Sequence, residues 1–280
     1  MTKWNLIIDV ARCTNCNNCV LALKDEYVGN DFPGYSAAHE LHGPSPLKIT
    51  RHVRGEGHLV DVTYVPRLCN HCDRPACLAA AGPGVVVKRP DGIVIIDPVA
   101  AVGRRDLVDA CPYGAIVWNE TAQLPQNWIF DAHLLDQGWK EPRCAHSCAA
   151  GAITAIALDD AAMARKARDE GLVVLSPELG TRPRVYYANY GRVASWFVGG
   201  TVVGRRNGVL DCIAVATVTL RADGATIATG ETDAFGDFKL DGIDRREGDL
   251  ALEITHADFA PATRMVAAGG TVVLGEIELA

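Results

Sequence analysis

The chain has 280 residues, of which 49% are hydrophobic and 22% charged, so it can bury the cores of two domains and is not a disordered protein. The net charge of −7 argues against a nucleic-acid-binding surface, which usually shows a basic excess. No run approaches the ~18 consecutive apolar residues of a membrane-spanning helix. Because the first cysteines follow the N-terminus too closely for a signal peptide, we expect a cytoplasmic protein with reduced cysteines.

The N-terminal half is expected to form a loop-rich domain with short strands. Residues 4–10 and 92–97 are apolar runs typical of buried strands, and residues 64–66 are expected to end a third strand. Residues 105–110 predict one or two helical turns. Loops rich in Pro, Gly and Asn bury little apolar surface, so we expect bound metal to stabilise this domain.

A helix is predicted over residues 158–171, because acidic residues lie near its start and Gly171 suits its end. Residues 176–190 are punctuated by proline and predict an extended connector that lies on the first domain. We therefore assign residues 1–195 to the first domain.

From about residue 197 the pattern changes to short alternating runs separated by Gly, Asp and Asn. Many of their residues are β-branched, as in strands with one buried face. The runs are residues 197–203, 214–220, 226–230, 235–240, 250–256 and 271–278. They predict an all-β sandwich over residues 196–280, which is similar in pattern to transthyretin-like and Cna-B-like sandwiches and is expected to have an accessory role. The fold class expected for the whole chain is α+β.

The ten cysteines are unevenly distributed, since nine precede residue 150 and only Cys212 follows. Two loops each carry three of them, and three more lie farther along. The triplets are Cys13-x2-Cys16-x2-Cys19 and Cys69-x2-Cys72-x4-Cys77, and the others are Cys111, Cys144 and Cys148. Bacterial ferredoxins bind a 4Fe–4S cluster with such a triplet and a fourth thiolate from a distant Cys-Pro. Cys111, which precedes Pro112, is the expected partner of the second triplet.

Zinc is the alternative metal, because cysteines two residues apart are common zinc ligands. Zinc sites usually combine two such pairs, whereas these cysteines occur as triplets with single distant partners. The run around Cys111, which reads Ala-Cys-Pro-Tyr-Gly-Ala, also resembles ferredoxin sequences. We therefore expect iron–sulfur clusters rather than a zinc-stabilised interaction module.

Residues 1–155 resemble the four-cluster ferredoxin subunits of the dimethyl sulfoxide reductase family of molybdenum or tungsten enzymes, which implies a tandem ferredoxin-like fold. In that family four cysteine motifs bind four clusters, and the first motif pairs with the fourth and the second with the third. The resemblance implies two complete ligand sets here, each for one 4Fe–4S cluster. They are Cys13, Cys16, Cys19 and Cys148, and Cys69, Cys72, Cys77 and Cys111.

At the family's other ligand positions, the cysteines are replaced by other residues. These replacements remove two cluster sites almost completely. One site would retain only Cys144, and the other would retain no ligand. The replacing residues are Leu23, Trp128 and Asp131 at the first of these sites, and Ala81, Ala101, Arg104 and Leu107 at the second. We expect Cys144 to be a buried thiol, Cys212 to be a packed core residue, and Arg104 to pair with a carboxylate in the vacated space.

Further segments narrow the resemblance within this family. Residues 31–35, 132–136, 142–146 and 179–187, with the C-terminal sandwich, resemble the small subunits of anaerobic hydroxylases and transhydroxylases of pyrogallol, phloroglucinol or resorcinol. The resemblance implies a large catalytic subunit that carries molybdenum and two pyranopterins and binds a phenolic substrate. This chain would carry electrons to or from the molybdenum, with an electron-acceptor protein as a further partner, or hold structural clusters in a non-redox transhydroxylase. The transhydroxylase small subunit is expected to bind three clusters, one more than this sequence supports.

Other polar residues are expected to support the clusters. His71, His133 and His146 lie near the cysteine loops and are expected to hydrogen-bond backbone groups or cluster sulfurs. Asp25 and Glu26 are expected to be solvated. Because no Ser/His/Asp combination or phosphate-binding loop is found, we expect no independent catalytic activity.

Overall fold

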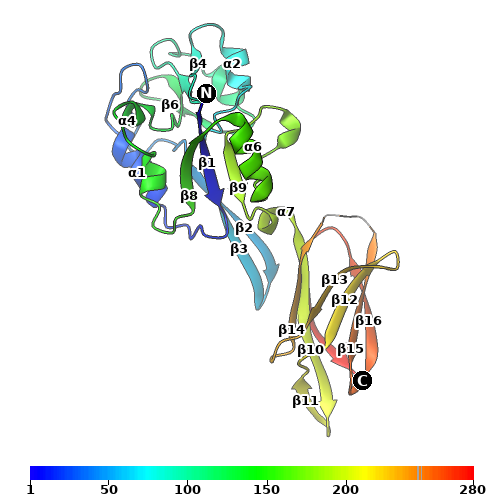
Figure 1. Cartoon of the computed structure of the whole chain (residues 1–280). Helices are drawn as coiled ribbons and strands as arrows, with labels where there is room; N and C mark the ends of the chain where they lie inside the picture. Colours follow the sequence, from blue (N-terminus) through cyan, green and yellow to red (C-terminus); the bar gives the residue numbers. More distant parts are fainter. Residues whose placement is uncertain (245, 247) are drawn as a thin grey trace. The chain divides into compact units, whose positions relative to one another are not determined.

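The computed structural model describes residues 1–244, 246 and 248–280 (Figure 1). It divides into two compact units, one made of residues 1–51 and 64–190 and the other of residues 52–63 and 191–280. The sequence instead divides the chain once, after residue 195. In the structure the division falls after residue 190, and part of an earlier hairpin groups with the C-terminal unit.

A three-stranded sheet crosses the first unit (Figure 1). The strand β1 (Lys3–Asp9) lies between β8 (Ile153–Leu158), which is antiparallel to it, and β9 (Val185–Ala188), which is parallel. Leu6 and Ile8 are fully buried, as alternate residues of a strand with one buried face should be. The strand predicted over residues 4–10 is therefore confirmed.

The segment after β8 is more ordered than the sequence suggests. The predicted helix is α6 (Asp160–Asp169), whose N-cap Asp159 accepts a hydrogen bond of 2.7 Å from the amide of Ala162. The predicted connector over residues 176–190 is wrong in part, because it forms the short 3-10 helix η1 (Pro177–Leu179) and then β9. The hydrogen bonds of β9 to β1 make this segment a part of the sheet rather than a strap.

Short helices and hairpins make up most of the rest of the first unit, although residues 52–63 of the β2–β3 hairpin belong to the second. The helix α1 (Asn18–Tyr27) packs against α5 (Arg143–His146). The other helices are α2 (Ala76–Ala81), α3 (Asp106–Asp109) and α4 (Ala132–Asp136). The hairpins pair β2 (Lys48–Glu56) with β3 (Leu59–Arg67), β4 (Val86–Lys88) with β5 (Val94–Ile96), and β6 (Ile116–Asn119) with β7 (Leu124–Asn127). The expected strands near residues 64–66 and 92–97 and the helical turn near 105–110 are confirmed.

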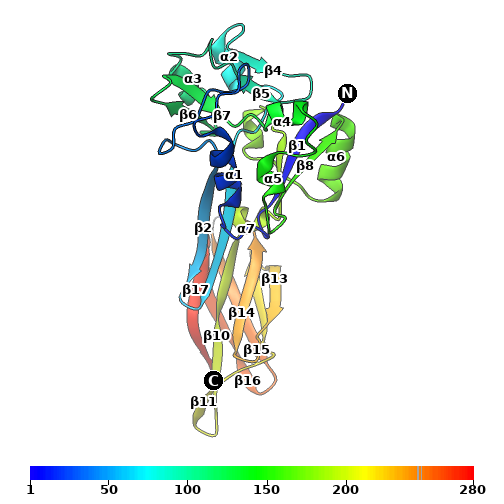
Figure 2. The same ribbon diagram turned by 90° about the vertical axis from the view of Figure 1, so that its left-hand side faces the viewer.

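The second unit consists mainly of two four-stranded sheets and begins with the short helix α7 (Gly191–Ala194). In one sheet β10 (Trp196–Arg206) pairs with β11 (Val209–Cys212), β14 (Asp237–Ile243) and β17 (Val272–Leu279), seen side by side in Figure 2. The other has the order β13 (Ala225–Glu231), β12 (Thr217–Ala222), β15 (Asp249–His256) and β16 (Phe259–Ala267). Val198 and Ile277 of the first sheet share one hydrophobic core with Leu220 and Leu252 of the second.

All six strands predicted in the C-terminal part are present, but β11 and β16 were not predicted. The prediction that Cys212 packs in the core is wrong. Cys212 ends β11, an edge strand whose four residues are all exposed, so no second layer covers the thiol. Among the described residues, none of the helices is long and apolar enough to cross a membrane.

Candidate metal centres

Four cysteines that are far apart in the sequence lie together beyond one end of the central sheet. Ile8, near the end of β1, pairs with Ile153 at the start of β8, so the loop after β1 and the loop before β8 leave the sheet at the same end. Asn15 and Asn17 have φ angles of 58° and 62°, a left-handed conformation that asparagine tolerates and that curls the first loop. As a result, one cavity is lined by Cys13, Cys16, Cys19 and Cys148, which we call the first quartet.

A separate cavity of the first unit is lined by Cys69, Cys72, Cys77 and Cys111, the second quartet. The loop after β3 supplies two of these thiols, α2 supplies Cys77, and the segment after α3 supplies Cys111. Val94 and Ile96 of β5 and Ile116 of β6 form apolar walls of the cavity. The structure thus places together both sets of four residues that the sequence analysis assigns to clusters.

Five of the eight thiols lie where burial disfavours the isolated thiolate. Burial, reinforced by neighbouring thiols, raises the pKa of Cys19 and of Cys77 to about 11. Burial likewise raises the pKa of Cys13, Cys69 and Cys72. Metal ligation requires thiolates, and the charge of the metal offsets both their desolvation and their mutual repulsion. The donor set therefore fits a site completed by a cationic metal centre.

Each quartet lines a cavity together with apolar side chains. Among the residues that the structure describes, no three His, Cys, Asp or Glu side chains form a group that could hold a single metal ion. Four cysteine thiolates are the usual ligands of a 4Fe–4S cluster. The donor set of each cavity therefore fits such a cluster.

One group of lost ligand positions is filled by packed side chains. Ala81, Ala101 and Leu107 stand where the family's second and third motifs have further cysteines. All three are buried in one hydrophobic cluster, together with Val86, Val94, Ile96 and Ile116. This part of the domain is held by apolar packing, which explains physically how it tolerates the loss of every ligand.

Arg104 occupies the remaining lost position of that group. Its Nη2 pairs with Oδ2 of Asp106 at 2.7 Å, which confirms the predicted carboxylate partner. Its guanidinium also donates to the carbonyl oxygens of Ala81 at 2.7 Å and Ala80 at 3.2 Å. These carbonyls lie at the C-terminal end of α2, where a cation is favoured.

The other group of lost positions surrounds a buried carboxylate. Asp131 accepts hydrogen bonds from the Tyr27 hydroxyl at 2.5 Å, the Trp128 indole at 3.3 Å and the Arg143 amide at 2.7 Å. Burial raises the pKa of Asp131 despite these donors. Cys144 is 1% exposed and unpaired, so the predicted buried thiol is confirmed.

The expectation that Glu26 is solvated is wrong. Because α1 packs against α5, the Glu26 side chain is only 13% exposed. It accepts a hydrogen bond of 2.5 Å from Nη1 of Arg143 and lies 2.8 Å from Nε2 of His133. Burial alone would raise the pKa of Glu26, but these two partners outweigh it and lower that pKa. Asp25 is exposed, as expected, and pairs with Arg143.

Of the three histidines, one contacts a cysteine loop. Nδ1 of His71 accepts a hydrogen bond of 3.0 Å from the amide of Val94 and lies 3.9 Å from Sγ of Cys69. The buried His71 ring also packs edge-on against Trp128. His133 instead pairs with Glu26, and the ring of His146 lies against Trp139.

Sequence reasoning missed three polar residues that line the second cavity. They are Asn70, Asn127 and Thr181, of which only Asn70 lies within a cysteine motif. Asn127 ends β7, and Thr181 precedes β9. Their separation along the chain leaves no spacing pattern, so the fold alone reveals that they share a site.

The comparisons with known proteins agree with this geometry. The chain is 39% identical over 282 residues to the pyrogallol hydroxytransferase small subunit of Pelobacter acidigallici, with full coverage of both chains. It is 34% identical to a tetrathionate reductase subunit of Salmonella typhimurium, over 66% of this chain and 72% of that protein. This chain thus belongs to the iron–sulfur subunits of the dimethyl sulfoxide reductase family. Residues 60–158 match the 4Fe-4S dicluster domain family.

A further relative matches about half of this chain. One chain of the anaerobic dimethyl sulfoxide reductase of Escherichia coli is 33% identical over 52% of this chain and 70% of that protein. Among solved structures, the minor pilin of Streptococcus agalactiae matches with a TM-score of 0.25 and 16% identity, over 45% of this chain and 52% of that chain. A likeness that weak carries no argument about the fold.

Proposed function

We propose that this chain is the electron-transfer subunit of a heteromeric, molybdopterin-dependent hydroxylase that acts on phenolic aromatic compounds. The observation that carries the proposal is the grouping of eight cysteines into two quartets, each around its own cavity. The full-length similarity to the pyrogallol hydroxytransferase small subunit supports a phenolic substrate, because it extends over both units of the fold. The partner would be a large subunit with molybdenum and two pyranopterins.

In this proposal, Cys13, Cys16, Cys19 and Cys148 hold one 4Fe–4S cluster, and Cys69, Cys72, Cys77 and Cys111 hold the other. A bound 4Fe–4S cluster supplies one-electron transfer. Hydroxylation of a substrate by water releases two electrons, so an electron path away from the catalytic subunit is needed. The apolar walls of the second quartet, such as Val94 and Ile96, exclude water from the thiolates.

A second candidate follows from the same similarity. A hydroxytransferase moves a hydroxyl group between two molecules without net oxidation, so its clusters need not conduct electrons. In that case this chain would be a structural subunit. The two candidates differ in one measurable respect, because only the hydroxylase requires an external electron acceptor for turnover.

The C-terminal sandwich, with its transthyretin-like or Cna-B-like pattern, is proposed as an accessory domain, and the cytoplasm as the compartment.

The experiment that tests the proposed function begins with purification of the chain with any co-purifying subunit. About eight irons and matching sulfide per chain would support two clusters, whereas zinc without sulfide would establish the interaction-module alternative. Cluster reduction by a phenolic substrate, with turnover that stops when the acceptor is removed, would support the hydroxylase. Turnover without any acceptor would establish the transhydroxylase.

A further inference from the structure

The second quartet has polar side chains beside its sulfurs. Nδ2 of Asn127 donates to Sγ of Cys69 at 3.4 Å. Thr181 lines the same cavity as the four cysteines. The Tyr113 hydroxyl lies 2.5 Å from Oγ1 of Thr181, so when Thr181 accepts from Tyr113 its own proton is free for an acceptor in the cavity. One thiol of this quartet thus has a side-chain donor, and a hydroxyl stands in the same cavity.

Asn70 adds an unsatisfied amide to the same cavity. Its side chain is 2% exposed, and neither Nδ2 nor Oδ1 has a hydrogen-bond partner. An unpaired buried polar group is destabilising, so native proteins rarely retain one without a role. Asn70 lines the cavity of the second quartet, where the sulfurs of a bound cluster would be acceptors for its Nδ2.

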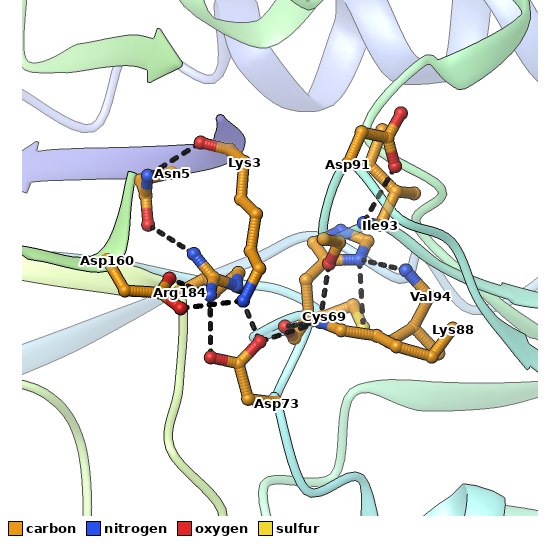
Figure 3. A network of polar contacts seen from close by, with 12 residues as sticks. Lys3, Asn5, Cys69, Asp73, Lys88, Asp91, Ile93, Val94, Asp160 and Arg184 are labelled. Carbon is orange, nitrogen blue, oxygen red and sulfur yellow. Dashed lines mark hydrogen bonds and ion pairs between the residues drawn. The ribbon is translucent and has the colours of Figure 1, made fainter. Parts of the chain in front are cut away.

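The backbone around Asn70 is held by hydrogen bonds on both sides. The Arg184 amide donates to the carbonyl oxygen of Asn70 at 2.8 Å. The Arg184 guanidinium binds Asp73 at 2.6 Å, as Figure 3 shows. Nζ of Lys88 donates to the carbonyl oxygens of His71 at 2.8 Å and Gly92 at 2.6 Å. These contacts hold the loop on both sides of Asn70, so its amide is positioned before a cluster binds.

The first quartet is surrounded differently. There, the amide of Ala152 donates to Sγ of Cys148 at 3.2 Å. A backbone donor does not depend on the side-chain type. The side-chain donors of the second quartet are therefore the feature that distinguishes the two sites and that substitution can remove.

We propose that Asn70, Asn127 and Thr181 donate hydrogen bonds to the sulfurs of the cluster held by the second quartet and raise its midpoint potential. The inference rests on the proposed function, since it requires a cluster at that site. Reduction adds one electron to the cluster and makes its sulfurs better acceptors, so donors stabilise the reduced form. The three residues tune the potential through the cluster sulfurs and are positioning residues, not catalytic ones.

The test is a redox titration of the holo-protein, purified with any subunit that accompanies it. Dithionite is the electron donor, and electron paramagnetic resonance follows each reduced cluster. The variants are Thr181→Val, which removes the hydroxyl at nearly constant volume, and Asn70→Leu. Thr181→Ser keeps the hydroxyl and is the matched control. Cys148→Ala, which removes a ligand of the first quartet only, identifies the signal of the second cluster.

We expect the double variant Thr181→Val/Asn70→Leu to lower the reduced-to-oxidised ratio of the second cluster about tenfold at a fixed potential. For a one-electron couple this equals ~59 mV. Thr181→Val alone is expected to give part of this shift, and Thr181→Ser little or none. The first cluster, measured in the same sample, is expected to keep its potential.

An unchanged potential of the second cluster in a Thr181→Val protein with full iron content would overturn the inference and leave the proposed function standing. Equal shifts of both clusters would also overturn it, because the effect would then not be local. If Asn70→Leu fails to retain iron, the isosteric Thr181→Val decides the question. Absence of iron and sulfide from the unaltered protein would instead refute the proposed function itself.

Discussion

The hydroxyl of Tyr27 donates a hydrogen bond of 2.5 Å to Oδ1 of Asp131, which lies 104 residues farther along the chain. Tyr27 ends α1, and Asp131 immediately precedes α4. The bond therefore joins the segments that carry the first and fourth cysteine motifs in the family. Both side chains are buried, so a polar contact of the protein's own side chains links these two segments.

Tyr27→Phe is expected to destabilise the holo-protein by about 1–3 kcal/mol, because it leaves a buried carboxylate with one donor fewer. Urea unfolding followed by circular dichroism measures the effect. Tyr35→Phe is the matched control, since the Tyr35 hydroxyl bonds to Asp136 near the surface. We expect the control to lose no more than about 0.5 kcal/mol. Equal losses of stability in both variants would show that the buried Tyr27–Asp131 hydrogen bond stabilises the protein no more than the bond near the surface.

Cys144 and Cys148 lie four residues apart but are expected to differ completely in metal binding. Cys144→Ala is expected to leave the iron content unchanged, because Cys144 lies outside both cavities. Cys148→Ala is expected to remove about half of the iron, since it deprives one cluster of a ligand. Iron and sulfide analysis of the two purified proteins checks both outcomes. Loss of iron from Cys144→Ala would show that this thiol still binds metal.

Leu107 stands at a lost ligand position and is fully buried in an apolar cluster. Leu107→Ala is therefore expected to destabilise the protein by about 2–5 kcal/mol, as core truncations do. Val99→Ala is the control, because Val99 is 82% exposed. Denaturant unfolding of the two variants, at equal iron content, measures the difference. A loss below about 1 kcal/mol for Leu107→Ala would contradict the view that packing has replaced the cluster.

Asp61 is expected to make the second unit sensitive to acid. Burial alone would raise its pKa, but ion pairs with Arg54 and Arg192 outweigh burial and lower the pKa of Asp61 to about 2. In the unfolded chain this pKa is about 3.9. The stabilisation by the ionised carboxylate is thus complete above pH ~4 and is lost as the pH falls from ~4 towards ~2.

Asp61→Asn tests this expectation in urea unfolding at pH 5 and pH 3. The variant should be less stable than the unaltered protein at pH 5, and the difference should shrink at pH 3. Val60→Ala, in the same strand, changes no titrating group and should give the same difference at both pH values. A loss in Asp61→Asn that does not depend on pH would refute the assigned pKa.

The cysteine triplets were predictable from the sequence because a cluster imposes short, fixed spacings on a single loop. The fourth cysteine of each quartet was harder to predict, since Cys148 reaches the first quartet only through the pairing of β1 with β8. The spacing of the cysteines contains no information about that strand pairing. The assignment of Cys148 to the first quartet came from the family resemblance. Whether the quartets bind clusters stays a prediction, although their geometry fits one.

The errors concern residues whose surroundings are set by tertiary contacts. Because free cysteines are usually buried, the sequence predicts a core position for Cys212, but it lies on an edge strand. The sequence predicts a solvated Glu26, but α5 covers it. The strand β16 was missed because Pro261 and polar residues interrupt its alternation, which an edge strand tolerates. In each case the neighbouring residues in the sequence gave no indication of which element packs against that position in the folded protein.

The two quartets are nested along the chain. All four ligands of the second quartet lie between Cys19 and Cys148, which belong to the first. During synthesis the inner set is therefore complete once residue 111 has been added, while the outer set still lacks its last thiol. The order of translation thus completes the inner set of thiols before the outer set.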